Sequence, residues 1–165
     1  MKTESFSNKL NTLLSRSIYD ASAQFELGVC YENGENGAAE DAAEAVMWFR
    51  KAAQLNYAPA HWRLSHYCRD GKAGVTQSLS DAMHHLQCAA DLGLAVAMNK
   101  IGDIYDDGKL VPKNLKMSFD WHLKAAMLGN RDAVLKIADD YAHGHGVRRS
   151  IKQAIRWYCT AAKKR

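Results

Sequence analysis

The chain has 165 residues and a net charge of +4, and 47% hydrophobic with 24% charged residues is the composition of an ordinary folded domain. This composition excludes an extensively disordered chain, and no window approaches the ~18 consecutive apolar residues that a membrane span needs. The first residues hold no apolar run of signal-peptide length, so the sequence predicts a cytoplasmic protein.

The cysteine pattern argues against a metal ribbon or a disulfide framework. Cys30, Cys68, Cys88 and Cys159 form no CxxC pair and no regular ladder. We therefore expect free thiols that are mostly buried.

The first predicted element is an amphipathic helix over residues 4–18, because its apolar residues recur at helical spacing. We expect residues 1–22 to cap the segment that follows, with polar side chains on the outer face. The apolar residues are Phe6, Leu10, Leu13, Leu14 and Ile18, and the polar ones include Lys2, Lys9, Asn11 and Arg16.

The rest of the chain repeats one helical phrase four times, at residues 23–34, 60–71, 97–108 and 133–144. Each phrase begins with alanine, has an aliphatic residue four positions on, then a small residue, and ends with glycine. These positions share one face of a helix, and the small residue permits close approach by a neighbouring helix. We call this element the A helix of each repeat.

A second phrase follows each A helix after a short loop, at residues 45–56, 82–93, 118–129 and 154–165. Its alanine pair and aromatic positions also recur at helical spacing, so it predicts a B helix. No alternating strand pattern occurs in the sequence, and the chain holds only two prolines.

Together the two phrases resemble the Sel-one-like repeat (SLR), a relative of the tetratricopeptide repeat. The fourth copy matches best, with GHGV at residues 144–147 and AIRWYCTAA at residues 154–162. Repeat two departs from the pattern at Cys68 and at His84 and His85, and repeat one has GENGAAED in place of the usual loop.

The resemblance implies an all-α fold, a right-handed superhelix (solenoid) of four SLR helix pairs with an N-terminal capping helix, about nine helices in all. It implies one SLR domain over residues 23–165. The expected repeats are 23–59, 60–96, 97–132 and 133–165.

In such a solenoid the A helices line the concave surface, which relatives of the tetratricopeptide repeat use to bind peptides. The predicted partner-binding groove is apolar and aromatic in its first half and acidic in its second. It suits a partner segment with an apolar anchor followed by lysine or arginine. The residues are Phe25, Val29, Glu32, Trp62, His66, Arg69, Asn99, Asp103, Asp106, Leu135 and Asp139.

Two alternatives remain open for this groove. Trp62 fits interhelical packing as well as it fits partner binding. The aspartates on exposed helices fit a role in solubility as well as one in recognition.

Charge is distributed unevenly, with 9 Lys/Arg and 14 Asp/Glu in residues 1–108 against 13 and 4 in residues 109–165. One face of the last helix therefore suits a polyanion such as nucleic acid. A solvated terminal helix is the interpretation that we favour, because no aromatic platform remains for bases. The candidate residues of this face are Arg149, Lys152, Arg156 and Lys163.

His143 and His145 lie one residue apart between glycines and could ligate a metal, but no third ligand follows in sequence, so we predict no metal site. No enzyme signature occurs, such as HExxH, a P-loop or GxSxG. The sequence thus favours a non-enzymatic adaptor without a cofactor, a monomer or weak dimer whose partner is another protein. Bacterial proteins that resemble this family serve in signalling, secretion and host interaction, so the resemblance also implies a possible immunity-linked or effector-linked role.

Overall fold

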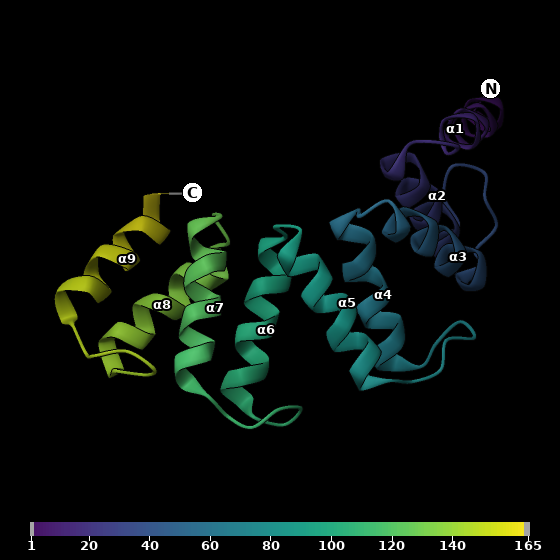
Figure 1. The fold of residues 1–165 in the computed structure, drawn as a ribbon. Coiled ribbons are helices and arrows are strands. Elements are labelled where there is room, and N and C mark those ends of the chain that lie inside the picture. The colour runs from purple at the N-terminus through teal and green to yellow at the C-terminus, as the bar shows by residue number, and fades with distance from the viewer. Residues whose placement is uncertain (1, 164–165) are drawn as a thin grey trace. The chain divides into compact units, whose positions relative to one another are not determined.

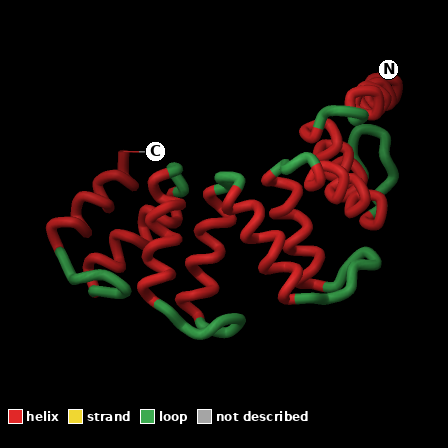
Figure 2. The backbone as a smooth tube through the Cα atoms, viewed as in Figure 1, coloured by secondary structure: helices red, strands yellow, loops and turns green. Residues whose placement is uncertain are grey.

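The structure, a computed structural model, describes the backbone of residues 2–163 and the side chains of residues 9–162. These residues form nine α-helices and no strand, and Figure 2 shows helices joined by loops. The predicted all-α fold of helix pairs is therefore confirmed. The helices are α1 (Lys2–Arg16), α2 (Ala21–Asn33), α3 (Ala42–Gln54), α4 (Ala58–Asp70), α5 (Leu79–Asp91), α6 (Ala95–Asp107), α7 (Leu115–Met127), α8 (Arg131–His143) and α9 (Ile151–Lys163).

The even-numbered helices α2 to α8 are the A helices of the four repeats, and the odd-numbered helices α3 to α9 are the B helices (Figure 1). Each A helix packs against the B helix that follows it. The chain divides into two compact units, unit 1 (Met1–Leu92) and unit 2 (Gly93–Arg165). The interpretation of residues 23–165 as one domain stays a prediction.

The helix ends follow from local chemistry. The side chain of Asp41 accepts hydrogen bonds from the backbone N–H groups of Ala43 and Glu44, which otherwise lack partners in the first turn of α3. Each A helix ends at a glycine, as predicted. At Gly34 and Gly108 the backbone φ angles of 67° and 72° are left-handed, which glycine adopts without steric cost.

The small residue of each A helix allows its B helix to approach closely. A Cβ atom added to Gly28 of α2 would lie 2.5 Å from Cε1 of Phe49 on α3, a side chain that is fully buried. In unit 2, a Cβ atom on Gly102 of α6 would collide with the ring of His122 on α7. The predicted close approach at this position is thus confirmed in both units.

The N-terminal helix differs in detail from its prediction. The helix α1 ends at Arg16, and Leu13 is buried against α2 together with Ala23 and Leu27. Ile18 was expected to share the apolar face, but it lies beyond the helix and is 67% exposed. The polar Asp20 caps α2, so the chain leaves the helix before Ile18 can complete another turn.

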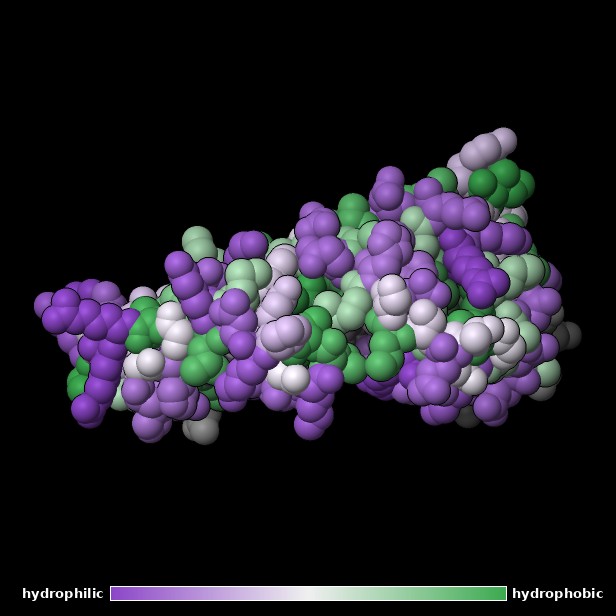
Figure 3. Space-filling model, turned by 60° about the horizontal axis from the view of Figure 1, so that its bottom comes forward, coloured by the Kyte–Doolittle hydropathy of each residue, from purple (hydrophilic) through white to green (hydrophobic). Residues whose placement is uncertain are grey.

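Hydrophilic residues cover most of the face shown in Figure 3, with hydrophobic residues in small groups between them. All four cysteines are free; two of them, Cys30 and Cys68, are buried, whereas Cys159 is exposed. Over the described part of the chain, the helices are too short or too polar to cross a bilayer.

Candidate partner-binding site

An open pocket of about 290 Å³ lies in unit 1 where α2 and α4 meet. The last turn of α2 supplies a carboxylate, and successive turns of α4 supply two aromatic rings spaced four residues apart, on one face of the helix. The lining residues are Glu32, Trp62, Arg63, His66, Tyr67, Asp70 and Lys72.

Glu32 is held in place by two residues of α4. The Tyr67 hydroxyl donates a hydrogen bond of 2.9 Å to Oε1 of Glu32, and Nη1 of Arg63 lies 3.1 Å from Oε2. Burial raises the pKa of the Tyr67 phenol, and the neighbouring Glu32 raises it further, to about 12. The phenol therefore remains a hydrogen-bond donor over the physiological range of pH.

The other side of the pocket is aromatic and charged. The rings of Trp62 and His66 meet edge to face, with their centroids 4.5 Å apart. Asp70 accepts a hydrogen bond of 2.7 Å from Arg69 and lies 3.6 Å from the ammonium of Lys72. The pocket thus offers an apolar surface beside carboxylates whose cations are largely exposed.

The predicted groove residues of unit 1 separate into two groups. Glu32, Trp62 and His66 come together in the pocket. Phe25 and Val29 instead pack against the buried core of α3 and α4, where the Phe25 ring lies 5.4 Å from the Phe49 ring between centroids. Arg69 is exposed and does not line the pocket, although it pairs with Asp70, which does.

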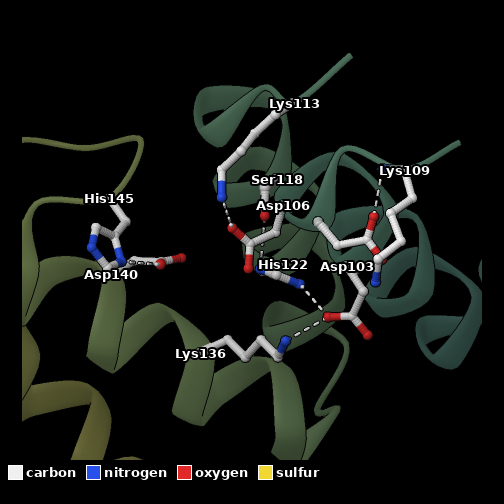
Figure 4. A network of polar contacts seen from close by, with 10 residues as sticks. Asp103, Asp106, Lys109, Lys113, Ser118, His122, Lys136, Asp140 and His145 are labelled. Atoms are coloured by element: carbon white, nitrogen blue, oxygen red, sulfur yellow. Dashed lines mark hydrogen bonds and ion pairs between the residues drawn. The ribbon is translucent and has the colours of Figure 1, made fainter. Parts of the chain in front are cut away.

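In unit 2, the predicted residue Asp103 lies at the centre of a partly buried polar network, shown in Figure 4. Its Oδ1 atom lies 2.6 Å from Nζ of Lys136 on α8 and 3.3 Å from Nε2 of His122 on α7. The other ring nitrogen of His122 lies 3.4 Å from the Ser118 hydroxyl. Burial raises the pKa of Asp103, but the hydrogen bonds from His122 and Lys136 outweigh burial and lower the pKa to about 2.

The remaining predicted residues of unit 2 also have partners within the chain or lie apart. Asp106 lies 3.6 Å from the ammonium of Lys113, and Asp139 accepts a short hydrogen bond from the Tyr158 hydroxyl. Leu135 is 40% exposed, and the buried Oδ1 of Asn99 has no hydrogen-bond partner among the described residues. The acidic half therefore presents less unpaired negative charge than its sequence suggests.

The sequence did not predict two cations that pair with acidic groove residues, one in unit 1 and one in unit 2. Arg63 and Lys136 occupy the sixth position of their A helices, and each pairs with an acidic residue of the preceding A helix, Glu32 and Asp103 respectively. A comparison of the sixth residue of each A helix could have revealed them, because that residue is lysine or arginine in three of the four repeats. The histidine of the network, His122, carries no such signal in sequence.

The predicted basic face of α9 is only partly formed, because Arg149 lies in the loop before the first residue of that helix. The guanidinium Nε of Arg149 donates a hydrogen bond of 2.9 Å to the carbonyl oxygen of Ala142, at the end of α8. Lys152 and Arg156 are exposed and form no ion pair with the described residues. The side chain of Lys163 lies outside the described residues.

The rings of His143 and His145 stack on each other and do not converge on a common metal position. The rings of His143 and His145 lie 5.5 Å apart between centroids, and Nδ1 of His143 lies 2.9 Å from the carbonyl oxygen of Asp139. Elsewhere, Nδ1 of His61 lies 3.0 Å from Nδ1 of His85. Across the side chains that the structure describes, no group of three or more His, Cys, Asp or Glu could hold a metal ion.

Tandem pairs of short helices, each with a small residue at the contact between A and B, define a helical repeat protein. The Sel1 repeat family model matches residues 21–57, 58–94, 95–130 and 132–165. The chain belongs to the Sel1 repeat family.

Solved structures and a curated protein show the same relationship. A Sel1 repeat protein from Oxalobacter formigenes is 31% identical, with a TM-score of 0.89 over 94% of this chain and 44% of its own. A protective antigen present in uropathogenic Escherichia coli strains, which displays an SLR fold, is 33% identical, with a TM-score of 0.84 over 94% of this chain and 33% of its own. Chitin synthase regulatory factor 3 of Schizosaccharomyces pombe is 30% identical over 66% of this chain.

This chain corresponds to only part of those proteins. The aligned segment spans 12% of the Schizosaccharomyces pombe protein and less than half of either solved structure. The shared property is therefore the Sel1 repeat, a scaffold that generally mediates contacts between proteins.

Proposed function

We propose that the chain is a non-enzymatic adaptor that binds a segment of another protein on its A-helix surfaces, with the pocket of unit 1 as the main contact. The observation that carries the proposal is the pocket itself. It gathers Trp62, His66 and Glu32 on a surface open to solvent. Trp62 is only partly buried and lines the pocket, whereas Phe25 packs against a buried core cluster.

The chemistry of the pocket suits an apolar side chain followed by a basic one. A large aromatic ring at the base of a pocket is a frequent centre of binding energy. A lysine or arginine of the partner could replace Lys72 beside Asp70, because that cation is 71% exposed at 3.6 Å and such surface pairs contribute little.

The same proposal extends to unit 2 by itself, where the A-helix residues would form a second contact with less unpaired charge. These residues are Asn99, Asp103, Asp106, Leu135 and Asp139. A regulatory role accords with the name of the Schizosaccharomyces pombe relative, a chitin synthase regulatory factor. The proposal includes the predicted cytoplasmic location in a bacterium and a monomeric or weakly dimeric state.

Selection of random peptides displayed on phage tests the proposal, with the whole chain as bait. We expect selected peptides to share an apolar residue followed by lysine or arginine, and Trp62→Ala to weaken their binding by at least about tenfold. Met47→Ala, an exposed apolar residue of the B helix α3 that lies outside the proposed binding surface, is the matched control for surface truncation. Equal binding to Trp62→Ala and to the unchanged chain, with circular dichroism confirming that both are folded, would rule out the pocket.

Polyanion binding through α9 is the second candidate, supported by Lys152 and Arg156, which are exposed and form no ion pair with the described residues. It is less favoured because Arg149 is partly engaged in capping α8. Binding of a duplex oligonucleotide that falls steeply with salt, and is abolished by Lys152→Glu with Arg156→Glu, would support it.

A further inference from the structure

The last helix of unit 2 carries an exposed apolar stripe. Its members recur at i, i+4, i+7, i+8 and i+11, which places them on one side of α9. Ile155 is 57% exposed, Ile151 is 50% exposed and Tyr158 is 41% exposed. In Figure 1, α9 lies at the edge of unit 2 with α8 beside it. The stripe consists of Ile151, Ile155, Tyr158, Cys159 and Ala162.

In α3 the equivalent residues are covered by a helix. The positions of Ile155, Tyr158 and Ala162 correspond to Val46, Phe49 and Ala53, which are 3%, 0% and 8% exposed. These three residues share one core cluster with residues of α4, including Ala60 and Leu64. The next A helix therefore buries this face of α3.

The same arrangement recurs in α7. Phe119, His122 and Ala126 occupy the equivalent positions and are 7%, 1% and 5% exposed. Phe119 and Ala126 belong to one core cluster with Ala133 and Ile137 of α8. The same face is thus covered in two B helices of this chain, α3 and α7. In both cases the covering element is an A helix, which has an alanine and an aliphatic residue four positions on.

The charges beside the stripe indicate which kind of partner could bind there. Lys152 and Arg156 lie on its flank, exposed and without ion pairs among the described residues. A second copy of α9 would bring like charges together, whereas a helix with acidic flanking residues would pair with them. Nucleic acid would meet the basic flank but leave the isoleucines uncovered.

One anchor is already held in position. The Tyr158 hydroxyl donates a hydrogen bond to Asp139 of α8, so its ring has less freedom to lose when a partner binds. Ile155 lies one turn before Tyr158 and is more exposed than either Ile151 or Tyr158.

We propose that the stripe of α9 docks an acidic amphipathic helix of a partner protein. Ile155 and Tyr158 anchor the apolar face of that helix, and Lys152 and Arg156 pair with its carboxylates. This surface is separate from the pocket of unit 1 and does not depend on the function proposed for that pocket.

A peptide copied from residues 129–146 is a suitable probe, because α8 covers the equivalent face of α7. An acidic version carries Arg131→Glu and Lys136→Glu, and a side-chain staple on its solvent face keeps it helical, since isolated helices of this length are marginal. Fluorescence anisotropy of the labelled peptides measures binding to the whole chain.

We expect the acidic peptide to bind more tightly than the unchanged one, and Ile155→Asp to weaken it by at least about tenfold. Met127→Asp changes another exposed apolar residue of unit 2, 76% exposed on α7, and should leave binding intact. Lys152→Glu with Arg156→Glu should remove the preference for the acidic peptide. Trp62→Ala should bind it normally, which separates this site from the pocket.

Alkylation of the exposed Cys159 locates the peptide, because a helix on the stripe should slow its reaction with iodoacetamide while the half-buried Cys88 of unit 1 reacts unchanged. Binding that survives Ile155→Asp, or that leaves Cys159 unprotected, would overturn the proposal. Absence of peptide binding would also overturn the proposal. In that case, self-association that Ile155→Asp abolishes would identify the stripe as a contact between two copies of the chain. Oligonucleotide binding that Ile155→Asp does not affect would instead identify the basic flank as a polyanion site.

Discussion

In two repeats, the eighth residue of the B helix packs against the glycine of its A helix. Phe49 and His122 lie against Gly28 and Gly102, which have no Cβ atom, and both side chains are almost completely buried. The fourth repeat has alanine in place of glycine, and its Tyr158 is 41% exposed and bonds to a carboxylate of α8. Repeat two has Ser65 at this position and its Leu86 is only 4% exposed, so the exposure of Tyr158 follows from the face of α9 that no described A helix covers rather than from the methyl group.

At the same scale, Asp103 is expected to make stability depend on pH. Its pKa is about 2 in the folded chain against an ordinary value of 3.8, so its stabilisation is complete above 3.8 and is lost as pH falls toward 2. Asp103→Asn should therefore lower the free energy of unfolding at neutral pH, and the difference between the two chains should shrink across that interval. Urea unfolding at a series of pH values measures it.

Asp120→Asn is the matched control, because Asp120 is exposed on α7 and forms no ion pair with the described residues. It should change the free energy of unfolding by less than about 0.5 kcal/mol. A difference between Asp103→Asn and the unchanged chain that stays constant down to pH about 2 would show that the network does not hold the carboxylate ionised.

At the scale of elements, the contact between each A helix and its B helix depends on the small residue. Gly28→Ala would place a methyl group against the buried Phe49 ring and force α2 and α3 apart. We expect it to lower the free energy of unfolding by about 1–3 kcal/mol. Glu26→Ala, exposed on the same helix, should have little effect in the same urea titration. Equal stability of the two variants would mean that the helix pair tolerates a wider separation.

The elements were largely predictable from sequence, and the candidate site was only partly so. Helix position follows from periodicity, capping aspartates and terminal glycines, all of which act within one or two turns. Trp62 and Phe25 occupy the same column of the repeat, yet one lines a pocket and the other packs against the core. Their difference depends on neighbouring helices, which the local pattern does not encode.

At the scale of the whole molecule, the chain consists of two compact units, each with its own buried core. In repeat proteins, each helix pair contacts mainly its neighbours, so stability is distributed along the chain. The unit boundary at residues 92 and 93 falls within the second predicted repeat, between its B helix and the next A helix.

A substitution in the core of one unit is therefore expected to act mainly on that unit. Leu27→Ala removes a fully buried side chain of unit 1 and should cost about 2–5 kcal/mol there. Hydrogen exchange followed by mass spectrometry should show faster exchange in α2 and α3 and little change in α7 and α8. Ile137→Ala, equally buried in unit 2, should give the reverse pattern. Equal acceleration in both units would instead support the single domain that the sequence predicts.

The sequence by itself determined the all-α repeat, the A and B helices and the positions of close approach, because these depend on spacings and residue sizes that recur every 36 or 37 residues. The tertiary structure alone decided which charges pair, which aromatic ring lines the pocket and which stripe of α9 stays uncovered. Long charged side chains have several partners within reach, and exposure depends on helices distant in sequence, so neither follows from a local pattern.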